Sequence, residues 1–405
     1  MTPSLLLPTN DGGTRAYQLG PATTWARPVA PLTARRAYAA AHVIPETGAD
    51  NTPGAPARLD WDATLAYRHE LWSYGLGVAD AMDTAQRGMG LDWAATAELI
   101  KRTGAEAAAV AAAGGAATAG KSIRDLVACG AGTDQLDPAA LPAGAAGLRA
   151  VIDAYREQIA VVREAGPKVI IMASRALAAV ARGPEDYLSV YSALLQEADQ
   201  PVILHWLGTM FDPALAGYWG SDDVARATET FLGLIREHAD KVDGVKVSLL
   251  DAAHEVALRA ALPAGVRLYT GDDFNYPELI DGDGTHHSDA LLGIFAAIYP
   301  AASVALQKYD AGGAPGARAV LDSTRELGRH IFAAPTFYYK TGIAFLSWLN
   351  GKQPGFQMVG GLQSGRSVVH LAHTFELADR AGLLLDPPLA AHRMGDFLRV
   401  AGVGA

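Results

Sequence analysis

Cysteine is almost absent from this sequence, with Cys129 as the single example. One thiol cannot form an internal disulfide or a cysteine-based zinc site, so we expect a reducing compartment, the cytoplasm. Long apolar runs are missing as well. No stretch of about 18 uncharged apolar residues occurs, and the N-terminus lacks a basic region followed by an apolar core. The sequence therefore predicts neither a membrane span nor a signal peptide.

Basic clusters are also scarce. The 405 residues include 33 Lys and Arg against 43 Asp and Glu, which gives a formal net charge of −10. A negative balance repels phosphate backbones, so we expect no nucleic-acid partner. Apolar residues, in contrast, make up 50% of the chain, enough for a large core. Together these features favour a cytoplasmic enzyme that acts on a small molecule.

Short apolar segments alternate with longer helical patterns between residues 36 and 311, which is typical of parallel strands joined by helices. The eight strand candidates are Arg36 to Val43, Gly75 to Met82, Leu126 to Gly130, Val169 to Ala173, Val202 to His205, Val242 to Val247, Val266 to Tyr269 and Gly284 to His287. Eight such units predict the α/β class and a (β/α)8 TIM barrel, whose catalytic residues lie at the carboxyl ends of the strands. A doubly wound sheet is less favoured, because no G-x-G-x-x-G follows the first strand.

Two regions lie outside this barrel. Turn formers at 10–13 predict a hairpin or cap within an N-terminal extension, residues 1–35. Residues 312–405 predict a C-terminal helical region, with helical patterns at 317–332, 336–349, 364–381 and 388–400. The alanine-rich stretch 104–120 predicts a helix that is broken at Gly114-Gly115.

Lys246 points most directly to chemistry. It lies in the apolar segment Val242 to Val247, a predicted buried strand. Burial lowers the pKa of an amine toward the range where the neutral form exists, and a neutral amine can attack a carbonyl group. The alternative is a lysine whose stem is buried and whose ammonium reaches water or pairs with a carboxylate such as Asp251.

Three motifs follow one another along this part of the chain: Gly244-Val245-Lys246, Tyr269-Thr270-Gly271-Asp272-Asp273 and Gly282-Asp283-Gly284. Over roughly residues 36–390 they resemble the dihydrodipicolinate synthase and N-acetylneuraminate lyase superfamily of class I aldolases, and more closely an uncharacterised branch of it. The resemblance implies that Lys246 is a Schiff-base lysine in a retro-aldol lyase or dehydratase. It also implies a homodimer or tetramer. We expect a small-molecule carbonyl substrate and no cofactor or metal.

His205 departs from the family pattern. The segment Pro201 to Trp206 resembles the strand that carries the catalytic tyrosine, and His205 occupies the matching position. An imidazole can move protons during carbinolamine formation, with a pKa near the operating pH. The alternative is a buried histidine that bonds to the backbone.

The segment 83–88 is a second departure. It stands where the family holds the substrate carboxylate, and of the family's two hydroxyls it keeps only that of Thr84. We expect Thr84 and Arg87 to anchor an anionic group, because a guanidinium binds carboxylates in a bidentate manner. A neutral polyol would instead need Asp83 and Gln86, and Arg87 would then form a structural ion pair.

Further polar residues are predicted at the same end of the barrel, namely Ser174, Asp272, Asp273 and His286. Asp272 and Asp273 are candidates for substrate binding or for capping their turn. His286 and His287 are adjacent on one predicted strand, so only one of them can face the barrel.

Two rival functions use some of these residues. A metal-dependent sugar isomerase or hydrolase would take His42, His205, Asp272 and one of His286 or His287 as ligands, although no local H-x-H or H-x-x-H spacing joins these residues. A non-catalytic relative of the aldolases is the other. We favour the lyase, acting on a small oxo-acid or an oxidised sugar derivative, because Lys246 is retained.

Overall fold

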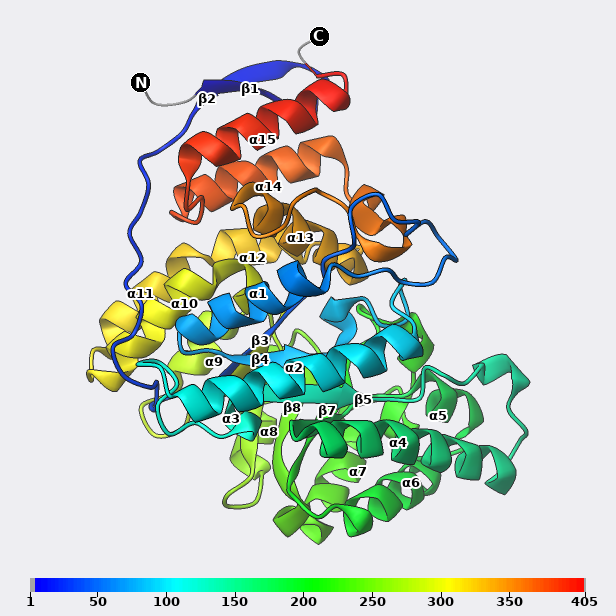
Figure 1. Ribbon diagram of the computed structural model, residues 1–405. Coiled ribbons are helices and arrows are strands. Elements are labelled where there is room, and N and C mark those ends of the chain that lie inside the picture. Colours follow the sequence, from blue (N-terminus) through cyan, green and yellow to red (C-terminus); the bar gives the residue numbers. More distant parts are fainter. Residues whose placement is uncertain (1–3, 404–405) are drawn as a thin grey trace.

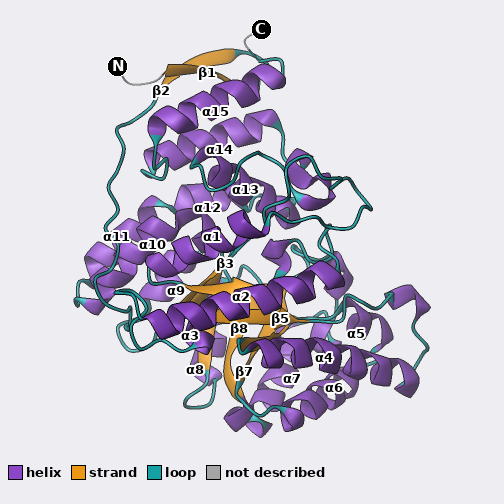
Figure 2. Ribbon diagram, viewed as in Figure 1, coloured by secondary structure: helices purple, strands orange, loops and turns teal. Residues whose placement is uncertain are grey.

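A closed barrel of eight parallel strands lies at the centre of the lower part of the molecule (Figures 1 and 2). The computed structural model describes residues 4–403. The barrel strands are β3 (Ala37–Ala40), β4 (Gly77–Asp80), β5 (Val127–Ala131), β6 (Lys168–Ile171), β7 (Val202–Leu207), β8 (Val242–Ser248), β9 (Arg267–Thr270) and β10 (Asp289–Leu292). Their order is β10-β3-β4-β5-β6-β7-β8-β9, so the predicted (β/α)8 barrel is confirmed.

Helices join successive strands and surround the barrel. The longer ones are α1 (Trp61–Ser73), α2 (Trp93–Ala113), α4 (Ala145–Ala165), α6 (Pro184–Glu197), α7 (Val224–Glu237), α8 (Ala252–Ala261) and α10 (Ile294–Asp310), and the shorter ones are α3 (Ile123–Leu126), α5 (Arg175–Val180) and α9 (Tyr276–Asp281). Aspartate side chains cap the starts of α1, α2, α7 and α8. Helix α2 ends at the predicted break, where Gly114 adopts a left-handed conformation with φ of 65°.

The alternation of side chains along each strand decides which residues enter the barrel. Ile203 and Tyr269 belong to the small apolar cluster inside it, whereas Val245 and Val247 pack in the larger core shared with the helices. Lys246 lies between these two valines on β8 and therefore faces the interior. His205, two residues after Ile203 on β7, does the same.

The eighth strand differs from the prediction. Gly284 to His287 form a loop, and the strand begins five residues later, at Asp289. The side chain of Asp283 accepts hydrogen bonds from the backbone N–H groups of Thr285 (2.9 Å) and His286 (2.7 Å), and this turn keeps the segment out of the sheet. The strand is instead the buried run 289–292, which pairs with β9 and β3.

Between α10 and residue 403, the structure has five α-helices: α11 (Ala314–Ser323), α12 (Arg325–Ile331), α13 (Tyr339–Leu349), α14 (Val368–Arg380) and α15 (Pro387–Val400). At the other end of the chain, β1 (Ser4–Pro8) and β2 (Thr14–Gln18) form an antiparallel hairpin around the expected turn. The hairpin packs against α14 and α15, far from the barrel strands (Figure 1). No helix within residues 4–403 has the length and apolar character needed to cross a membrane.

Candidate active site

Lys246 and His205 are directly paired across strands β8 and β7. Both side chains are buried, with 5% and 1% of their surface exposed. Burial lowers the pKa of Lys246, while the carboxylates of Asp83 and Asp273 act in the opposite direction. Within residues 4–403 the ammonium has no carboxylate within 4.0 Å. The alternative partner Asp251 caps α8 by accepting a hydrogen bond from His254 N–H.

Asp83 is the first residue of a short 3₁₀ turn, η1 (Asp83–Ala85), directly after β4. Burial alone would raise the pKa of Asp83, but the positive charges of Lys246 and Lys340 outweigh it and the pKa is lowered. The Tyr339 hydroxyl donates to Asp83 Oδ2 over 2.8 Å. Asp83 is therefore an ionised carboxylate next to the Schiff-base candidate.

Tyr339 is a site residue that the sequence did not reveal. It begins helix α13, outside the barrel, stacks on Phe332 and hydrogen-bonds to the Thr84 hydroxyl as well as to Asp83. Burial and the charge of Asp83 raise its pKa well above the usual value, so the phenol stays protonated. The only local signal is an aromatic-basic run at residues 338–340 in the C-terminal helices.

His205 is neutral in this environment. Burial, followed by the positive charge of Lys246, lowers its pKa well below the usual value. Nε2 lies 3.4 Å from the Ser248 hydroxyl, and Nδ1 is buried without a hydrogen-bond partner in the described chain. Ser248 was also missed, although its place two residues after Lys246 puts it on the same face of β8.

The two aspartates after β9 have different roles. Asp272 accepts hydrogen bonds from the N–H groups of Phe274 (2.9 Å) and Asn275 (3.0 Å), and from the Asn275 side chain (2.8 Å). It therefore caps the turn, the alternative considered above. Asp273 accepts one bond from Ile294 N–H (2.7 Å), and burial raises its pKa well above the usual value although Lys246 opposes this. Asp273 is therefore a buried carboxyl group that interacts electrostatically with Lys246.

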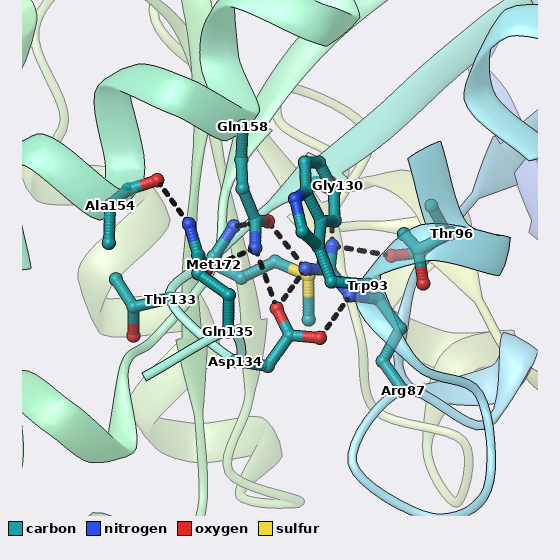
Figure 3. A network of polar contacts seen from close by, with 12 residues as sticks. Arg87, Trp93, Thr96, Gly130, Thr133, Asp134, Gln135, Ala154, Gln158 and Met172 are labelled. Carbon is teal, nitrogen blue, oxygen red and sulfur yellow. Dashed lines mark hydrogen bonds and ion pairs between the residues drawn. The ribbon is translucent and has the colours of Figure 1, made fainter. Parts of the chain in front are cut away.

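Arg87 does not have the geometry expected of a substrate anchor. Its Nε and one Nη2 hydrogen go to Asp134, the other Nη2 hydrogen goes to Gln158, and Nη1 donates to the carbonyls of Ala81 (3.1 Å) and Gly130 (2.7 Å). A guanidinium has five N–H donors, so all of them are used. Figure 3 shows Asp134 and Gln158 converging on Arg87. The ion-pair alternative describes this residue.

Gln86 and Ser174 are held by protein contacts. Gln86 Nε2 donates to Val359 O over 2.8 Å, which ties the loop after β4 to the C-terminal region. The Ser174 hydroxyl bonds to Thr133 (2.6 Å) and caps α5 through Leu177 N–H (2.9 Å). Ser174 still lines a cavity at this end of the barrel.

His286 lies away from the site. Its side chain is 64% exposed, in the loop that precedes β10 and hence at the amino ends of the strands, whereas Lys246 is near a carboxyl end. His287 shares this loop. Both histidines lie outside the site because the eighth strand begins at Asp289, after them.

The metal-ligand set of the rival function does not come together. Across residues 4–403, no group of three or more His, Cys, Asp or Glu side chains is arranged to hold a metal ion. His42 Nε2 is 2.9 Å from Gln353 Oε1, and burial lowers the His42 pKa to about 4. Its contact is with the C-terminal region, and neither His286 nor His287 approaches it.

A family model described as "Protein of unknown function (DUF993)" matches residues 5–403. The chain belongs to this family. No curated protein matches the sequence significantly. This membership agrees with the uncharacterised branch suggested by the Lys246 motifs.

Solved structures of the dihydrodipicolinate synthase family share the fold. The enzyme from Thermotoga maritima has a TM-score of 0.60 at 13% identity, covering 87% of this chain and 100% of its own. The enzyme from Aquifex aeolicus has a TM-score of 0.58 at 13% identity, with coverages of 87% and 99%. A prophage protein of the family from E. coli K12, solved in complex with pyruvate, has a TM-score of 0.58 at 14% identity, with coverages of 91% and 99%. The resemblance is confirmed, and at these identities it concerns an aldolase-type fold.

Proposed function

We propose that this DUF993 protein is a Schiff-base-forming lyase that acts on a small oxo-acid or an oxidised sugar derivative. The observation that carries the proposal is a buried lysine near the carboxyl end of the sixth barrel strand. It forms no salt bridge with any described residue, and Asp83, Asp273 and His205 lie around it. Such a lysine has a lowered pKa, so its neutral amine is accessible for attack on a carbonyl carbon.

The first half-reaction needs two proton transfers. The Lys246 amine adds to the carbonyl carbon, its proton moves to the carbonyl oxygen, and the hydroxyl of the carbinolamine leaves as water when it is protonated, which gives the iminium. Tyr339 donates its hydroxyl hydrogen to Asp83 in the resting site, so these two residues form a proton relay beside the amine. Neutral His205 can accept or return a proton on the other side.

The iminium then withdraws electrons from the neighbouring bond. In a retro-aldol step, a base removes the β-hydroxyl proton and the carbon–carbon bond breaks to an enamine and a carbonyl product. In a dehydration, the base removes the α-proton and the β-hydroxyl leaves as water. Asp83 is ionised and suits the base role in either step, while Asp273, with its raised pKa, suits the acid role.

Borohydride trapping tests this proposal. Incubation with a panel of oxo-acids and keto-sugars, followed by reduction, should add the mass of one compound to the peptide that contains Lys246. The Lys246→Met variant should give no adduct, and Lys101→Arg, a change at an exposed lysine, should behave as wild type. An adduct elsewhere, or none across the panel, would contradict the lyase and favour a non-catalytic relative.

The proposal includes the cytoplasmic location, the lack of a cofactor and the dimer or tetramer that the sequence predicts. Light scattering on the purified protein tests the assembly.

A further inference from the structure

A cavity of about 170 Å³ opens at the carboxyl ends of β4 to β7, beside the Lys246 site. Loops after these strands form most of it, through Asp83, Ser174, Arg175 and Asp212, and helix α13 contributes Lys340. Asp83 lines the cavity and also interacts electrostatically with Lys246, so the cavity adjoins the reacting end of the proposed lyase. A substrate bound to Lys246 could extend its far end into this space.

Lys340 is another buried lysine, with 3% of its surface exposed. Its ammonium contacts the carbonyl of Phe337 (3.2 Å) and the sulfur of Met89 (3.5 Å). Within the described chain it has no carboxylate within 4.0 Å. An ammonium carries three donors, and burying its charge without a counter-ion is costly. Within the described chain, the buried positive charge of Lys340 is therefore not paired with a nearby negative charge.

Arg175 supplies a second cation to the same cavity. Its Nε donates to Asp212, and Nη1 and Nη2 make no hydrogen bond to any described residue. Gly88, in the left-handed conformation with φ of 68°, lies against this free edge, and a Cβ at that position would be 3.0 Å from Nη1. The absence of a side chain at Gly88 leaves the guanidinium fork open, as bidentate binding of an oxyanion requires.

We propose that this cavity binds an anionic oxygen group of the substrate, a carboxylate or a phosphate, through Lys340 and Arg175. The inference rests on the proposed lyase and narrows its substrate class to carbonyl compounds with an anionic group remote from the reacting carbonyl. It assigns to Lys340 and Arg175 the anchoring role that the sequence suggested for Arg87, whose donors are all used within the protein.

Binding of simple probes tests the subsite without any reaction. Isothermal titration calorimetry of the full chain should detect glutarate or inorganic phosphate, and the stronger of the two identifies the preferred anion. Glutaramide, the neutral diamide, should bind at least tenfold more weakly. Arg175→Gln and Lys340→Met should each weaken the anion roughly ten- to hundredfold, since a charged hydrogen bond is worth about 1.5–3 kcal/mol.

Two further variants make the test decisive. Lys340→Arg keeps the positive charge and should bind the anion more tightly than Lys340→Met, and Arg182→Gln, a change at an exposed arginine outside the cavity, should match wild type. If Lys340→Met does not fold, Arg175→Gln alone decides. The Arg175 side chain is 47% exposed, so replacing it should leave the fold intact. No binding of either anion, or equal affinity in wild type and Arg175→Gln, would overturn the subsite.

The outcome is separable from that of the lyase itself. Glutarate and phosphate have no ketone or aldehyde and cannot form an imine. Anion binding that depends on Arg175, together with a failed borohydride experiment, would contradict the lyase and support the subsite. A Lys246 adduct without anion binding would do the reverse.

Discussion

Two carboxylates near Lys246 differ in their environments, and the proposed lyase can use this difference for acid and base chemistry. Asp83 lies near two lysines and accepts the Tyr339 hydroxyl, so its pKa is lowered despite burial. Asp273 has one backbone donor and its pKa is raised by burial. Titratable groups whose pKa values are pushed apart form an acid and base pair at one site. The pair therefore offers a proton acceptor and a proton donor at one pH.

His205 should matter for proton transfer. With a substrate found by trapping, His205→Phe is expected to lower kcat by roughly 10²–10⁴-fold, the usual effect of losing an acid-base group. His205→Tyr should retain more activity, because a phenol can carry a proton. Because the pKa of His205 is far below its usual value, the pH profile of the wild type should show no titration of this group near neutrality. Equal rates for the wild type and the Phe variant would place the proton relay with Tyr339 and Asp83 alone.

Arg87 should act on stability. Arg87→Met removes the partner of Asp134 and Gln158 and the guanidinium donor to the carbonyls of Ala81 and Gly130. We expect the free energy of unfolding to fall by about 3 kcal/mol, as when one partner of a buried ion pair is removed. Urea denaturation measures this loss. A variant with unchanged stability but a strongly raised KM would show instead that Arg87 anchors the substrate, as the sequence suggested.

At the scale of elements, the sequence predicts best those features that depend on residues close together along the chain. Strand alternation is local, so the barrel follows from it, whereas the position of His205 beside Lys246 was implied only by the family resemblance. Tyr339 meets Thr84 across 255 residues of sequence, and no local pattern reports such a contact. Arg87 was assigned to substrate for a similar reason, because its partner Asp134 comes 47 residues later.

The eighth strand is a case in which a local pattern predicted the wrong position for an element. A Gly-x-Gly turn suggests that a strand follows directly. The turn is longer here, because the side chain of Asp283 accepts hydrogen bonds from the N–H groups of Thr285 and His286. The true strand has the composition Asp-Ala-Leu-Leu, which has little β propensity. Its place is set by pairing with both neighbours in the closed barrel, a tertiary effect.

Helix α8 carries a buried acid whose titration should affect stability. Glu255 accepts hydrogen bonds from Thr270 on β9 (2.9 Å) and from Ser288 (2.8 Å), and burial raises its pKa from 4.5 to about 8. Because the folded-state pKa exceeds the unfolded one, the contribution of this group is fully present below pH 4.5 and is lost as the pH rises through 8.

Glu255→Gln removes this titration. Compared with wild type, the variant should become progressively more stable between pH 5 and pH 8, by roughly 3–4 kcal/mol at the upper end. Urea denaturation at both pH values measures the change. Glu229→Gln, at an exposed glutamate on α7, should leave the difference between the two pH values unaltered. A Glu255→Gln variant whose stability differs from that of wild type by the same amount at both pH values would show that Glu255 is already ionised in the folded protein across this range.

At the scale of the whole molecule, the two ends of the chain form one layer above the barrel (Figure 1). The Tyr17 hydroxyl donates to Asp379 (2.7 Å), and the Trp25 indole donates to Gly382 O (2.8 Å). Arg15 forms an ion pair with the buried Glu376. Helix α14, which carries Asp379 and Glu376, packs against α13, which carries Tyr339 and Lys340. The N-terminal hairpin thus supports the helices that cover the active face.

Leu7 gives a clean test of this support. Its side chain is 2% exposed, whereas that of its neighbour Leu6 on the same strand is 53% exposed, because successive side chains point to opposite faces. Leu7→Ala should lower the free energy of unfolding by about 2–5 kcal/mol, the usual cost of emptying a buried leucine site, and Leu6→Ala should have little effect. Hydrogen exchange should locate the change: protection should fall first in β1, α14 and α15, which pack together, while β4 to β8 keep theirs. If protection falls equally in the barrel strands, the hairpin, the helices and the barrel unfold as one cooperative unit, and the layer has no separate stability.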